Sequence, residues 1–404
     1  MVQSMARAGG PAGAVANKQH QQPVGFVELF FDVVFVFAFT RFSERLVEDF
    51  SWMNSWATLV LMLAMWWFWY RVVWTTNRYD PERPAIQLIV IVAMLGTLLM
   101  SAAVPAAALT ERGVVFAWVY VTVQLLRPLW LLLVGGPNGY PRLVHVRILF
   151  WTAMSAVPWI AGALVEDGLR LALWSVAVVI DYGGGILDFP TPRLGRAGLR
   201  GQPISGEHLT ERCRQLLIIA LGEAVLASGI QFSPYGFERD RTVALLVSFV
   251  ITVLLWHLYY YRAGVLLRAA IASASAPARV SELASYAHLI MVIGISLSAV
   301  GDTLIITHPF GHTRWTWVAV IFGGPALFLA GRSMLDYAVF SHISWSRPIG
   351  VLLLAALAPV ALRLPPVVVA MLAAVVLAAI ALSNVVAWRL VPRAPAPPGM
   401  QAAR

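Results

Sequence analysis

Long apolar runs, separated by short polar or charged connections, make up most of this chain. A helix needs about 20 predominantly apolar residues to cross the hydrocarbon core of a bilayer. Twelve runs come near that length, and the connections between them are too short to hold a soluble domain. We therefore predict twelve membrane-spanning helices, at about residues 26–47, 54–74, 85–106, 114–134, 146–165, 169–188, 209–230, 241–262, 283–306, 315–336, 346–362 and 365–390.

The remaining sequence divides the chain into segments. Residues 1–24 and 392–404 are rich in Ala, Gly, Gln and Pro, a composition typical of disordered tails. Residues 191–207 are predicted to link a first membrane unit, 25–190, to a second, 208–391. The start of the chain lacks the basic, apolar and small-residue pattern of a removable signal peptide.

Composition supports a membrane protein of the all-α, polytopic class. Hydrophobic residues make up 59% of the chain and charged residues 12%, against about 25% charged in soluble domains; the mean hydropathy is +0.75. The net charge of +9 comes almost entirely from arginine. In a membrane protein such an excess reports topology, and we expect no nucleic-acid partner. A single cysteine, Cys213, excludes an intramolecular disulfide.

The distribution of basic residues predicts the orientation. With the N-terminal tail placed in the cytoplasm, 20 of the 29 Lys and Arg fall on that side and 8 on the other, Arg127 lying within a span. Positive residues favour the cytoplasmic side. Both termini are therefore predicted to be cytoplasmic.

The two membrane units show weak internal similarity. Trp66-Trp-Phe-Trp-Tyr-Arg71 aligns with His257-Leu-Tyr-Tyr-Tyr-Arg262 at an offset of 191, and Pro158 aligns with Pro359 at an offset of 201. Because six helices separate the equivalents, the repeats would point the same way through the membrane, related by an axis along its normal. We predict two parallel six-helix repeats.

The first predicted helix carries two acids, Glu28 and Asp32, on one face near its cytoplasmic end. A charged side chain near the centre of a membrane helix costs about 2.5–3.5 kcal/mol. One interpretation is a cation or proton site. The other is a packing lock, with Glu28 paired to Arg71 and, in the second repeat, Glu211 paired to Arg262.

Other acids also fall within predicted spans. Glu223 lies twelve residues beyond Glu211, roughly 18 Å deeper, which makes it a candidate proton or ion carrier near mid-membrane. Asp181 and Asp302 are candidates for the same pathway or partners in interhelical hydrogen bonds. Asp181 precedes three glycines, which favour close helix packing or, alternatively, an unwound segment beside a cavity.

Several further polar residues have structural explanations. Arg332 and Asp336, four residues apart, are expected to form an intrahelical ion pair. His257 and His288 are able to titrate near neutral pH, although hydrogen-bonded interior histidines are the simpler interpretation. We expect no metal site and no cofactor. Familiar catalytic motifs are absent from the sequence, so we expect no enzyme activity, with an intramembrane enzyme as the third hypothesis.

Two stretches carry a family resemblance. Val27-Glu-Leu-Phe-Phe-Asp-Val-Val-Phe-Val-Phe-Ala-Phe-Thr40 and His208-Leu-Thr-Glu-Arg-Cys-Arg-Gln-Leu-Leu-Ile-Ile-Ala-Leu-Gly-Glu223 resemble the hallmark segments of the bacterial low temperature requirement protein A family. That resemblance implies a multi-pass protein of the bacterial plasma membrane. The family name refers to a growth phenotype, which implies a role in stress response without specifying a biochemical activity.

The first stretch is also distantly similar to the first helix of six-plus-six potassium channels of lysosomes and bacteria. Those channels have Ser before the aspartate, where this chain has Phe31, and the second copy here has Gln215 in place of the aspartate. The similarity therefore implies a shared architecture without potassium selectivity.

Taken together, the sequence predicts a membrane protein that moves a small ion or solute through an acidic cluster of its first and seventh helices. The alternative is a non-transporting protein of cold or stress adaptation whose charges are structural. The expected partners are the lipid bilayer and an unidentified small ion or solute. The sequence leaves a homo-oligomer open.

Overall fold

The computed structural model describes residues 24–107, 112–134, 141–199, 205–260 and 263–390. The described residues form thirteen α-helices and one short 3-10 helix, η2 (Ser233–Tyr235), with a single isolated β-bridge and no strand. The α-helices are α2 (Phe26–Glu48), α3 (Trp52–Arg78), α4 (Pro84–Ala107), α5 (Arg112–Val134), α6 (Arg142–Ala163), α7 (Asp167–Ile186), α8 (Gly206–Phe232), α9 (Arg239–Tyr260), α10 (Ala263–Ser273), α11 (Pro277–Thr307), α12 (Trp315–Phe340), α13 (Ser346–Ala361) and α14 (Pro366–Leu390).

The all-α, polytopic prediction is confirmed. Ten of the described helices are long and apolar enough to cross a membrane. The charged residues of α2 keep it out of that set, and α13 has only 16 residues. Each of the twelve predicted spans corresponds to a helix, whereas the short α10 was missed. Of the two predicted tails, only residue 24 lies among the described residues.

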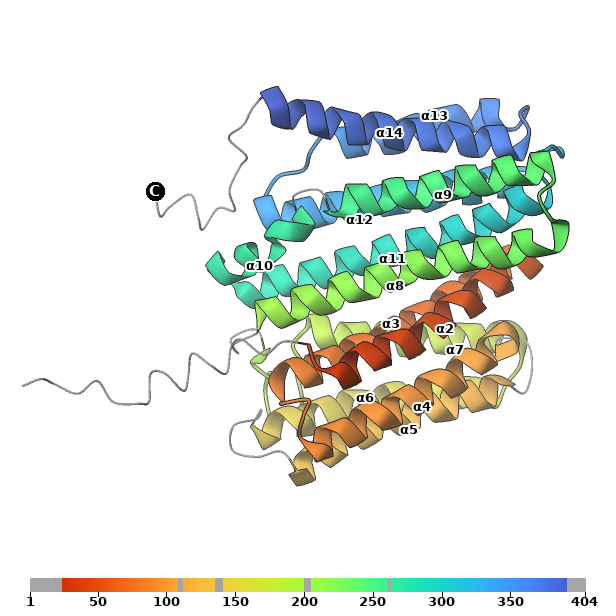
Figure 1. Cartoon of the computed structure of the whole chain (residues 1–404). Coiled ribbons are helices and arrows are strands. Elements are labelled where there is room, and N and C mark those ends of the chain that lie inside the picture. The colour runs from red at the N-terminus through yellow and green to blue at the C-terminus, as the bar shows by residue number, and fades with distance from the viewer. Residues whose placement is uncertain (1–23, 108–111, 135–140, 200–204, 261–262, 391–404) are drawn as a thin grey trace, which may run out of the picture.

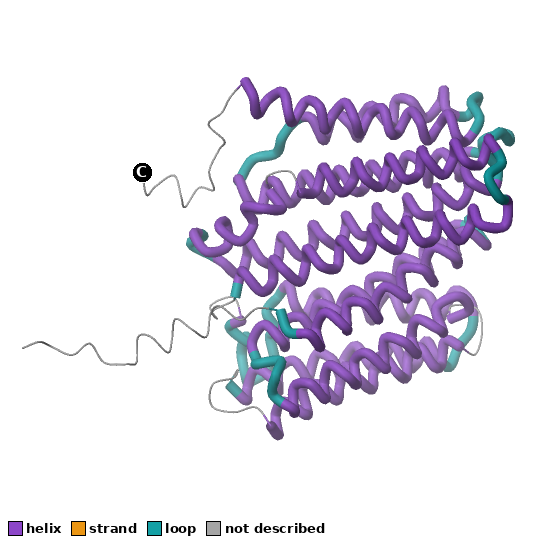
Figure 2. Tube along the Cα trace, in the orientation of Figure 1, coloured by secondary structure: helices purple, strands orange, loops and turns teal. Residues whose placement is uncertain are grey.

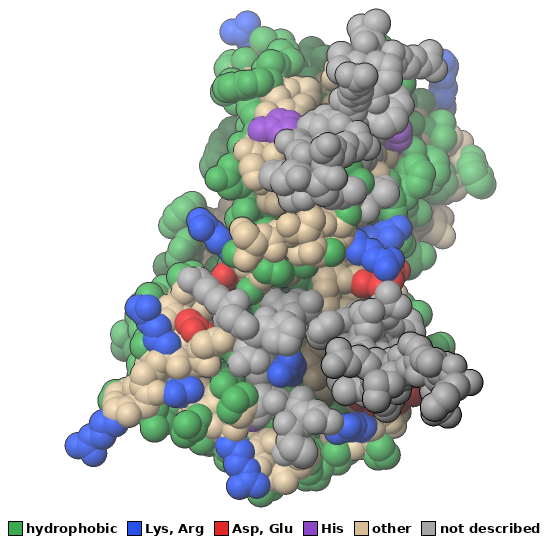
Figure 3. Space-filling view, turned by 90° about the vertical axis from the view of Figure 1, so that its left-hand side faces the viewer, with side chains coloured by type: hydrophobic (Ala, Val, Ile, Leu, Met, Phe, Trp, Pro, Cys, Tyr) green, Lys and Arg blue, Asp and Glu red, His purple; other side chains and the backbone are tan. Residues whose placement is uncertain are grey.

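The helices run side by side in one elongated bundle (Figure 1). Helices α2–α7 gather in its lower half and α8–α14 in its upper half, with α2 and α8 at the junction. Helix α2 packs against α4, α8 and α11. Loops collect at the two ends of the bundle (Figure 2), and both ends of the described chain lie at the left-hand end. Figure 3 views that end directly, and arginine side chains stand out on its described surface.

Close helix contact depends on glycine at α11 and α12. A Cβ atom on Gly294 would lie 2.6 Å from the backbone nitrogen of Phe328, and one on Gly324 would lie 2.6 Å from that of Ser298. Either distance is too short for a side chain, so these positions bring the two backbones together. Gly184 and Gly185 of α7 similarly accommodate the rings of Trp151 and Trp67. Of the three glycines after Asp181, Gly184 and Gly185 thus allow close packing, whereas a Cβ atom on Gly183 would meet nothing within 4 Å.

Candidate functional site

Helices α2 and α8 meet through a buried charge cluster. Both helices start at the same end of the bundle (Figure 1), and two contacts with the same sequence separation hold them in register. His208 Nε2 lies 2.9 Å from Glu28 Oε1, and Arg212 Nη2 lies 2.7 Å from Asp32 Oδ1. All four side chains are at most 1% exposed. We call these four residues the α2–α8 cluster.

Neighbouring groups complete the α2–α8 cluster. The indole nitrogen of Trp69, on α3, donates a 2.8 Å hydrogen bond to Asp32 Oδ1. The backbone nitrogen of Gly25 donates to Glu28 Oε2 at 2.9 Å. Arg212 Nη1 is 3.8 Å from Glu28 Oε1, so this guanidinium lies between both carboxylates. The cluster therefore connects three helices from the two halves of the chain.

Asn77 determines which nitrogen of His208 carries the proton. Its side chain pairs with the backbone of Ser205: Oδ1 accepts from the Ser205 nitrogen at 3.2 Å, and Nδ2 donates to the Ser205 oxygen at 2.9 Å. This two-point pairing fixes the orientation of the amide. Nδ2 then also donates to His208 Nδ1, at 3.3 Å. Consequently Nε2 carries the hydrogen and donates it to Glu28, with the imidazole neutral.

Glu28 and Glu211, the two acids of the predicted packing lock, contact residues other than the predicted partners. Glu28 contacts His208 and Arg212, whereas the guanidinium of Arg71 lies over the rings of Trp67 and Phe189, at 5.7 and 5.1 Å. Glu211 has a side chain 44% exposed and pairs with Arg214 at 3.3 Å, outside the α2–α8 cluster. Its predicted partner, Arg262, lies outside the described residues. The α2–α8 cluster thus contains His208 and Arg212, which were not among the residues of the predicted acidic cluster.

A second group of acids lies deeper in the bundle. Glu223 on α8 and Asp302 on α11 are each 3% exposed and within electrostatic reach of each other. We call them the acidic pair. Among the described residues neither forms an ion pair with an arginine or histidine, and both carboxylate oxygens of Glu223 and Oδ2 of Asp302 lack a hydrogen-bond partner of normal geometry.

Hydroxyl groups surround the acidic pair from three helices. Thr40 of α2 lies beside Glu223, while Ser228 of α8 and Ser248 of α9 lie beside Asp302. Asp302 also borders a small cavity of about 10 Å³, where Pro325 interrupts α12. Oxygen-rich surroundings of this kind suit a hard cation or a proton, because carboxylate and hydroxyl oxygens are the ligands such cations prefer.

A large hollow opens at the end of the bundle opposite the described chain termini. Its volume is about 1250 Å³, and polar and aromatic side chains from α8, α9, α11 and α12 line it. Thr303, the neighbour of Asp302, is part of the wall, and so is Gln231, which lies eight residues beyond Glu223 on α8. At 1.5 Å per residue that is roughly 12 Å along the helix. Neither Glu223 nor Asp302 is itself part of the wall of the hollow.

Asp181 belongs to a separate network in the lower half. It accepts hydrogen bonds from the hydroxyl of Tyr120 at 2.8 Å and from the indole nitrogen of Trp159 at 3.4 Å. Gln124 links Tyr120 to Arg127, at 3.4 and 3.2 Å. Asp181 is thus an interhelical hydrogen-bond partner joining α5, α6 and α7.

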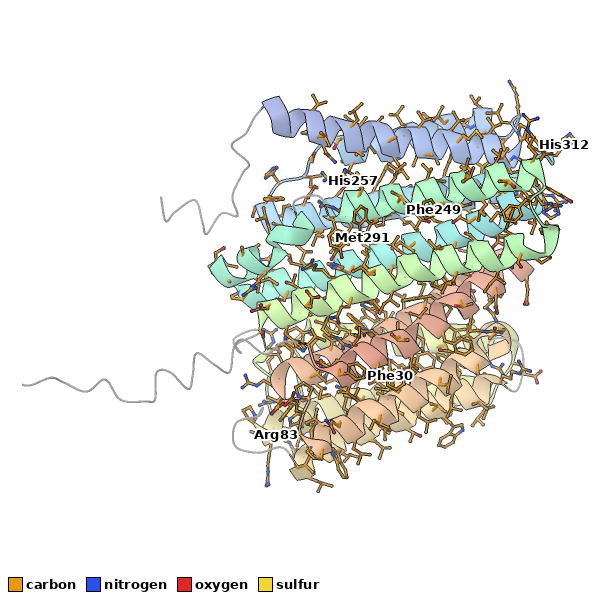
Figure 4. All side chains as sticks on the ribbon, in the orientation of Figure 1. Phe30, Arg83, Phe249, His257, Met291 and His312 are labelled. Carbon is orange, nitrogen blue, oxygen red and sulfur yellow. The ribbon has the colours of Figure 1, made fainter. Side chains whose placement is uncertain are left out.

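The remaining candidates take part in local contacts. Arg332 pairs with Asp336 on α12, as their spacing predicts, and Arg347 Nη1 approaches the other carboxylate oxygen at 2.5 Å. His288 is fully buried between the carbonyl of Ala284, at 2.7 Å, and the hydroxyl of Tyr259, at 3.0 Å. His257 lies on α9 near the left-hand end, and His312 in the loop at the opposite end (Figure 4).

His208 and Arg212 were the functional residues that sequence reasoning missed. Their spacing of four residues matches that of Glu28 and Asp32, and both lie in the second hallmark stretch. Complementary charges at equal spacing on two apolar helices could have indicated the contact. Nothing in the sequence indicated that Glu223 would lie within electrostatic reach of Asp302, because the rotation of each helix is set by packing.

Comparison with known proteins shows similarity over most of the chain. The family model described as bacterial low temperature requirement A protein matches residues 23–382. A protein of Rhizobium meliloti (strain 1021), itself described as uncharacterized, is 34% identical over 341 residues, which cover 83% of this chain and 82% of the relative. The match to the family model extends over α2–α13 and most of α14.

Proposed function

The chain belongs to the bacterial low temperature requirement A family, and from the buried acidic pair we propose that it moves a small cation or proton across the plasma membrane. The observation that carries the proposal is that Glu223 and Asp302 are both buried, within electrostatic reach of each other, and without a basic partner among the described residues. Two like-charged carboxylates are not stable together in a low-dielectric interior. A proton or a cation between them relieves the repulsion.

In this proposal the hollow is the entrance at one end of the bundle, and Thr303, next to Asp302 in the chain, lies in its wall. We place that end outside the cell, because both ends of the described chain and the arginine-rich surface lie at the other end. The α2–α8 cluster lies between the acidic pair and the cytoplasm, near the start of both helices. In this proposal it closes the inner end of the path.

The proposal includes twelve crossings arranged as two parallel six-helix repeats. Helix neighbours support it, because equivalent pairs pack together in the two halves: α2 with α4 and α8 with α11, α4 with α5 and α11 with α12, and α3 with α7 and α9 with α14. Helix α10 is then an addition to the second repeat. The in-register contact of α2 with α8 is what a two-fold axis along the membrane normal predicts.

The alternative is a non-transporting membrane protein whose charges are structural. One observation favours it: in the α2–α8 cluster each acid has a basic or hydrogen-bonding partner, as a packing contact requires. The acidic pair has no basic partner among the described residues, which is why we favour transport. A role in cold or stress tolerance is compatible with either function.

Ion flux into proteoliposomes tests the proposal. Vesicles with the purified chain receive imposed gradients of K⁺, Na⁺ or H⁺, with a pH-sensitive dye inside. We expect flux above that of empty vesicles, and a fall of about tenfold or more in Glu223→Gln and Asp302→Asn, the effect of losing roughly 1.4 kcal/mol of cation stabilisation. The matched control is Glu207→Gln, because Glu207 is a surface acid of the same helix, paired with Arg268. Wild-type flux equal to that of empty vesicles would refute transport, and unchanged flux in both variants would refute the site.

A further inference from the structure

A small cavity lies beside Asp302 in the upper half of the bundle (Figure 1), between α9, α11, α12 and α14. Its volume is about 10 Å³. Asp302 and Ser298, one turn apart on α11, are the polar side chains of its wall, and the other side chains are apolar. The cavity is therefore a closed apolar space with two polar groups on one side.

Asp302 brings a carboxylate without a partner to this cavity. The residue is 3% exposed, and its Oδ2 atom has no hydrogen-bond partner. Among the described residues it forms no ion pair with an arginine or histidine. A buried charge is costly unless a charge of opposite sign lies against it. The carboxylate therefore favours a positively charged ligand in the cavity.

The hydroxyl groups near Asp302 offer oxygen lone pairs and no hydrogen. Ser298 Oγ donates to the backbone oxygen of Gly294, at 2.9 Å. Ser248 of α9, which lies beside Asp302, donates in the same way to Ala244, at 3.1 Å. A hydroxyl has a single hydrogen, so both oxygens can only accept. A proton on the carboxylate would use one of these acceptors, whereas a metal cation can use several.

Pro325 frees a further oxygen at the wall. A helical carbonyl points toward the nitrogen four residues later, and proline has no N–H to donate. The backbone oxygen of Ile321 therefore lacks the hydrogen bond that residue 325 would otherwise supply. Ile321 and Pro325 both line the cavity, so this oxygen lies at its wall. It adds a third kind of hard oxygen ligand to the carboxylate and the hydroxyl.

Two glycines give these oxygens their positions. A Cβ atom on Gly324 would lie 2.5 Å from Ser298 Oγ, so the absence of a side chain lets this hydroxyl lie against α12. Gly301 itself lines the cavity, and a Cβ atom there would lie 3.4 Å from the Cα atom of Ile321, an ordinary contact distance. A methyl group at residue 301 would thus narrow the cavity without a clash.

We propose that this cavity binds a sodium ion without its hydration shell, held by the Asp302 carboxylate, the Ser298 hydroxyl and the backbone oxygen of Ile321. A water molecule needs about 10–15 Å³ on the same scale, so the space suits Na⁺ better than K⁺, which is about as large as water. Ca²⁺ takes about six to eight oxygen ligands and Mg²⁺ keeps several waters, more than this space holds. The inference rests on the proposed function, because it identifies the cation that the acidic pair attracts.

Thermal unfolding of the purified chain in detergent tests the site without any flux. Sodium chloride replaces choline chloride at constant ionic strength, and potassium chloride replaces it in a parallel series. We expect a saturable rise in Tm of a few degrees with Na⁺, since a ligand that binds only the folded state stabilises it. K⁺ should need a concentration at least about tenfold higher for the same rise. Saturable binding of radiolabelled sodium should follow the same concentration dependence.

Ser298→Ala removes one ligand and should weaken Na⁺ binding by about tenfold or more. Ser285→Ala is the matched control, because Ser285 is a buried serine of the same helix with the same bond to its own backbone, at 2.8 Å, and lies outside the wall of the cavity. It should keep the full Na⁺ response.

Gly301→Ala narrows the cavity and should abolish the Na⁺ response while the chain stays folded, since alanine is favoured over glycine within a helix. Gly183→Ala on α7, where a Cβ atom would meet nothing within 4 Å, is its control. Pro325→Ala restores an N–H that competes for the Ile321 oxygen, and it should weaken Na⁺ binding. Pro359→Ala, a proline within α13, should not.

The results separate this inference from the proposed function. A wild-type Tm that does not respond to Na⁺, an equal response to K⁺, or a full Na⁺ response in Gly301→Ala would overturn the sodium site. Flux of H⁺ or K⁺ without Na⁺ binding would do the same and leave transport standing. Na⁺ binding without flux of any ion would refute transport and support the site.

Discussion

Removal of Arg212 should strongly destabilise the contact between the two halves of the chain. Its guanidinium lies between Asp32, at 2.7 Å, and Glu28, at 3.8 Å, and all three side chains are fully buried. Replacing it with leucine keeps most of the volume on α8 but leaves two carboxylates without their cation. His208 alone would remain, as a neutral donor to Glu28.

The size of the effect follows from burial. Removing one partner of a buried ion pair costs about 3–5 kcal/mol, because the other partner remains as an uncompensated charge. Exposed pairs contribute about 0–1 kcal/mol. Arg214→Leu is therefore the matched control: Arg214 lies two residues further along α8 and pairs with Glu211, with side chains 35% and 44% exposed. We expect the two variants to differ by at least about 2 kcal/mol.

Reversible unfolding in mixed detergent and SDS micelles, followed by tryptophan fluorescence, measures the difference. The double variant Asp32→Leu/Arg212→Leu should be more stable than Arg212→Leu alone, since replacing both members of a buried pair by apolar residues is often neutral. Equal stability of Arg212→Leu and Arg214→Leu would contradict the role of the α2–α8 cluster in joining the two halves. So would a double variant whose loss of unfolding free energy equals the sum of the losses in Asp32→Leu and Arg212→Leu.

Three further predictions concern packing and hydrogen bonding. Gly294→Ala should cost about 1–3 kcal/mol in the same unfolding assay, because its Cβ would meet the backbone of α12; Gly222→Ala, with open space around its Cβ, should be neutral or stabilising. Asn77→Ala should cost about 1–3 kcal/mol by leaving buried partners without hydrogen bonds, and nitrogen NMR of His208 should show a mixture of tautomers instead of one. Trp69→Phe should destabilise by about 1–3 kcal/mol through loss of the donor to Asp32, whereas Trp52→Phe, at an 81% exposed position, should not.

The sequence alone determined the helices. For example, a span predicted at 114–134 is α5 at Arg112–Val134, and one predicted at 315–336 is α12 at Trp315–Phe340. Hydropathy is a local property, and a bilayer requires long apolar segments whatever their neighbours are. The prediction missed α10, whose 11 residues are too few to produce a spanning signal.

Only the tertiary structure decided which polar residues meet. The sequence singled out Glu28, Asp32 and Glu223 as costly acids, but it could not place Arg212 against Asp32, 180 residues away, or Asp302 beside Glu223. It also grouped Glu211 with the interior acids, whereas the structure leaves that side chain half-exposed on another face of α8. These pairings depend on the rotation and register of packed helices, which arise from side-chain fit between segments far apart in the chain.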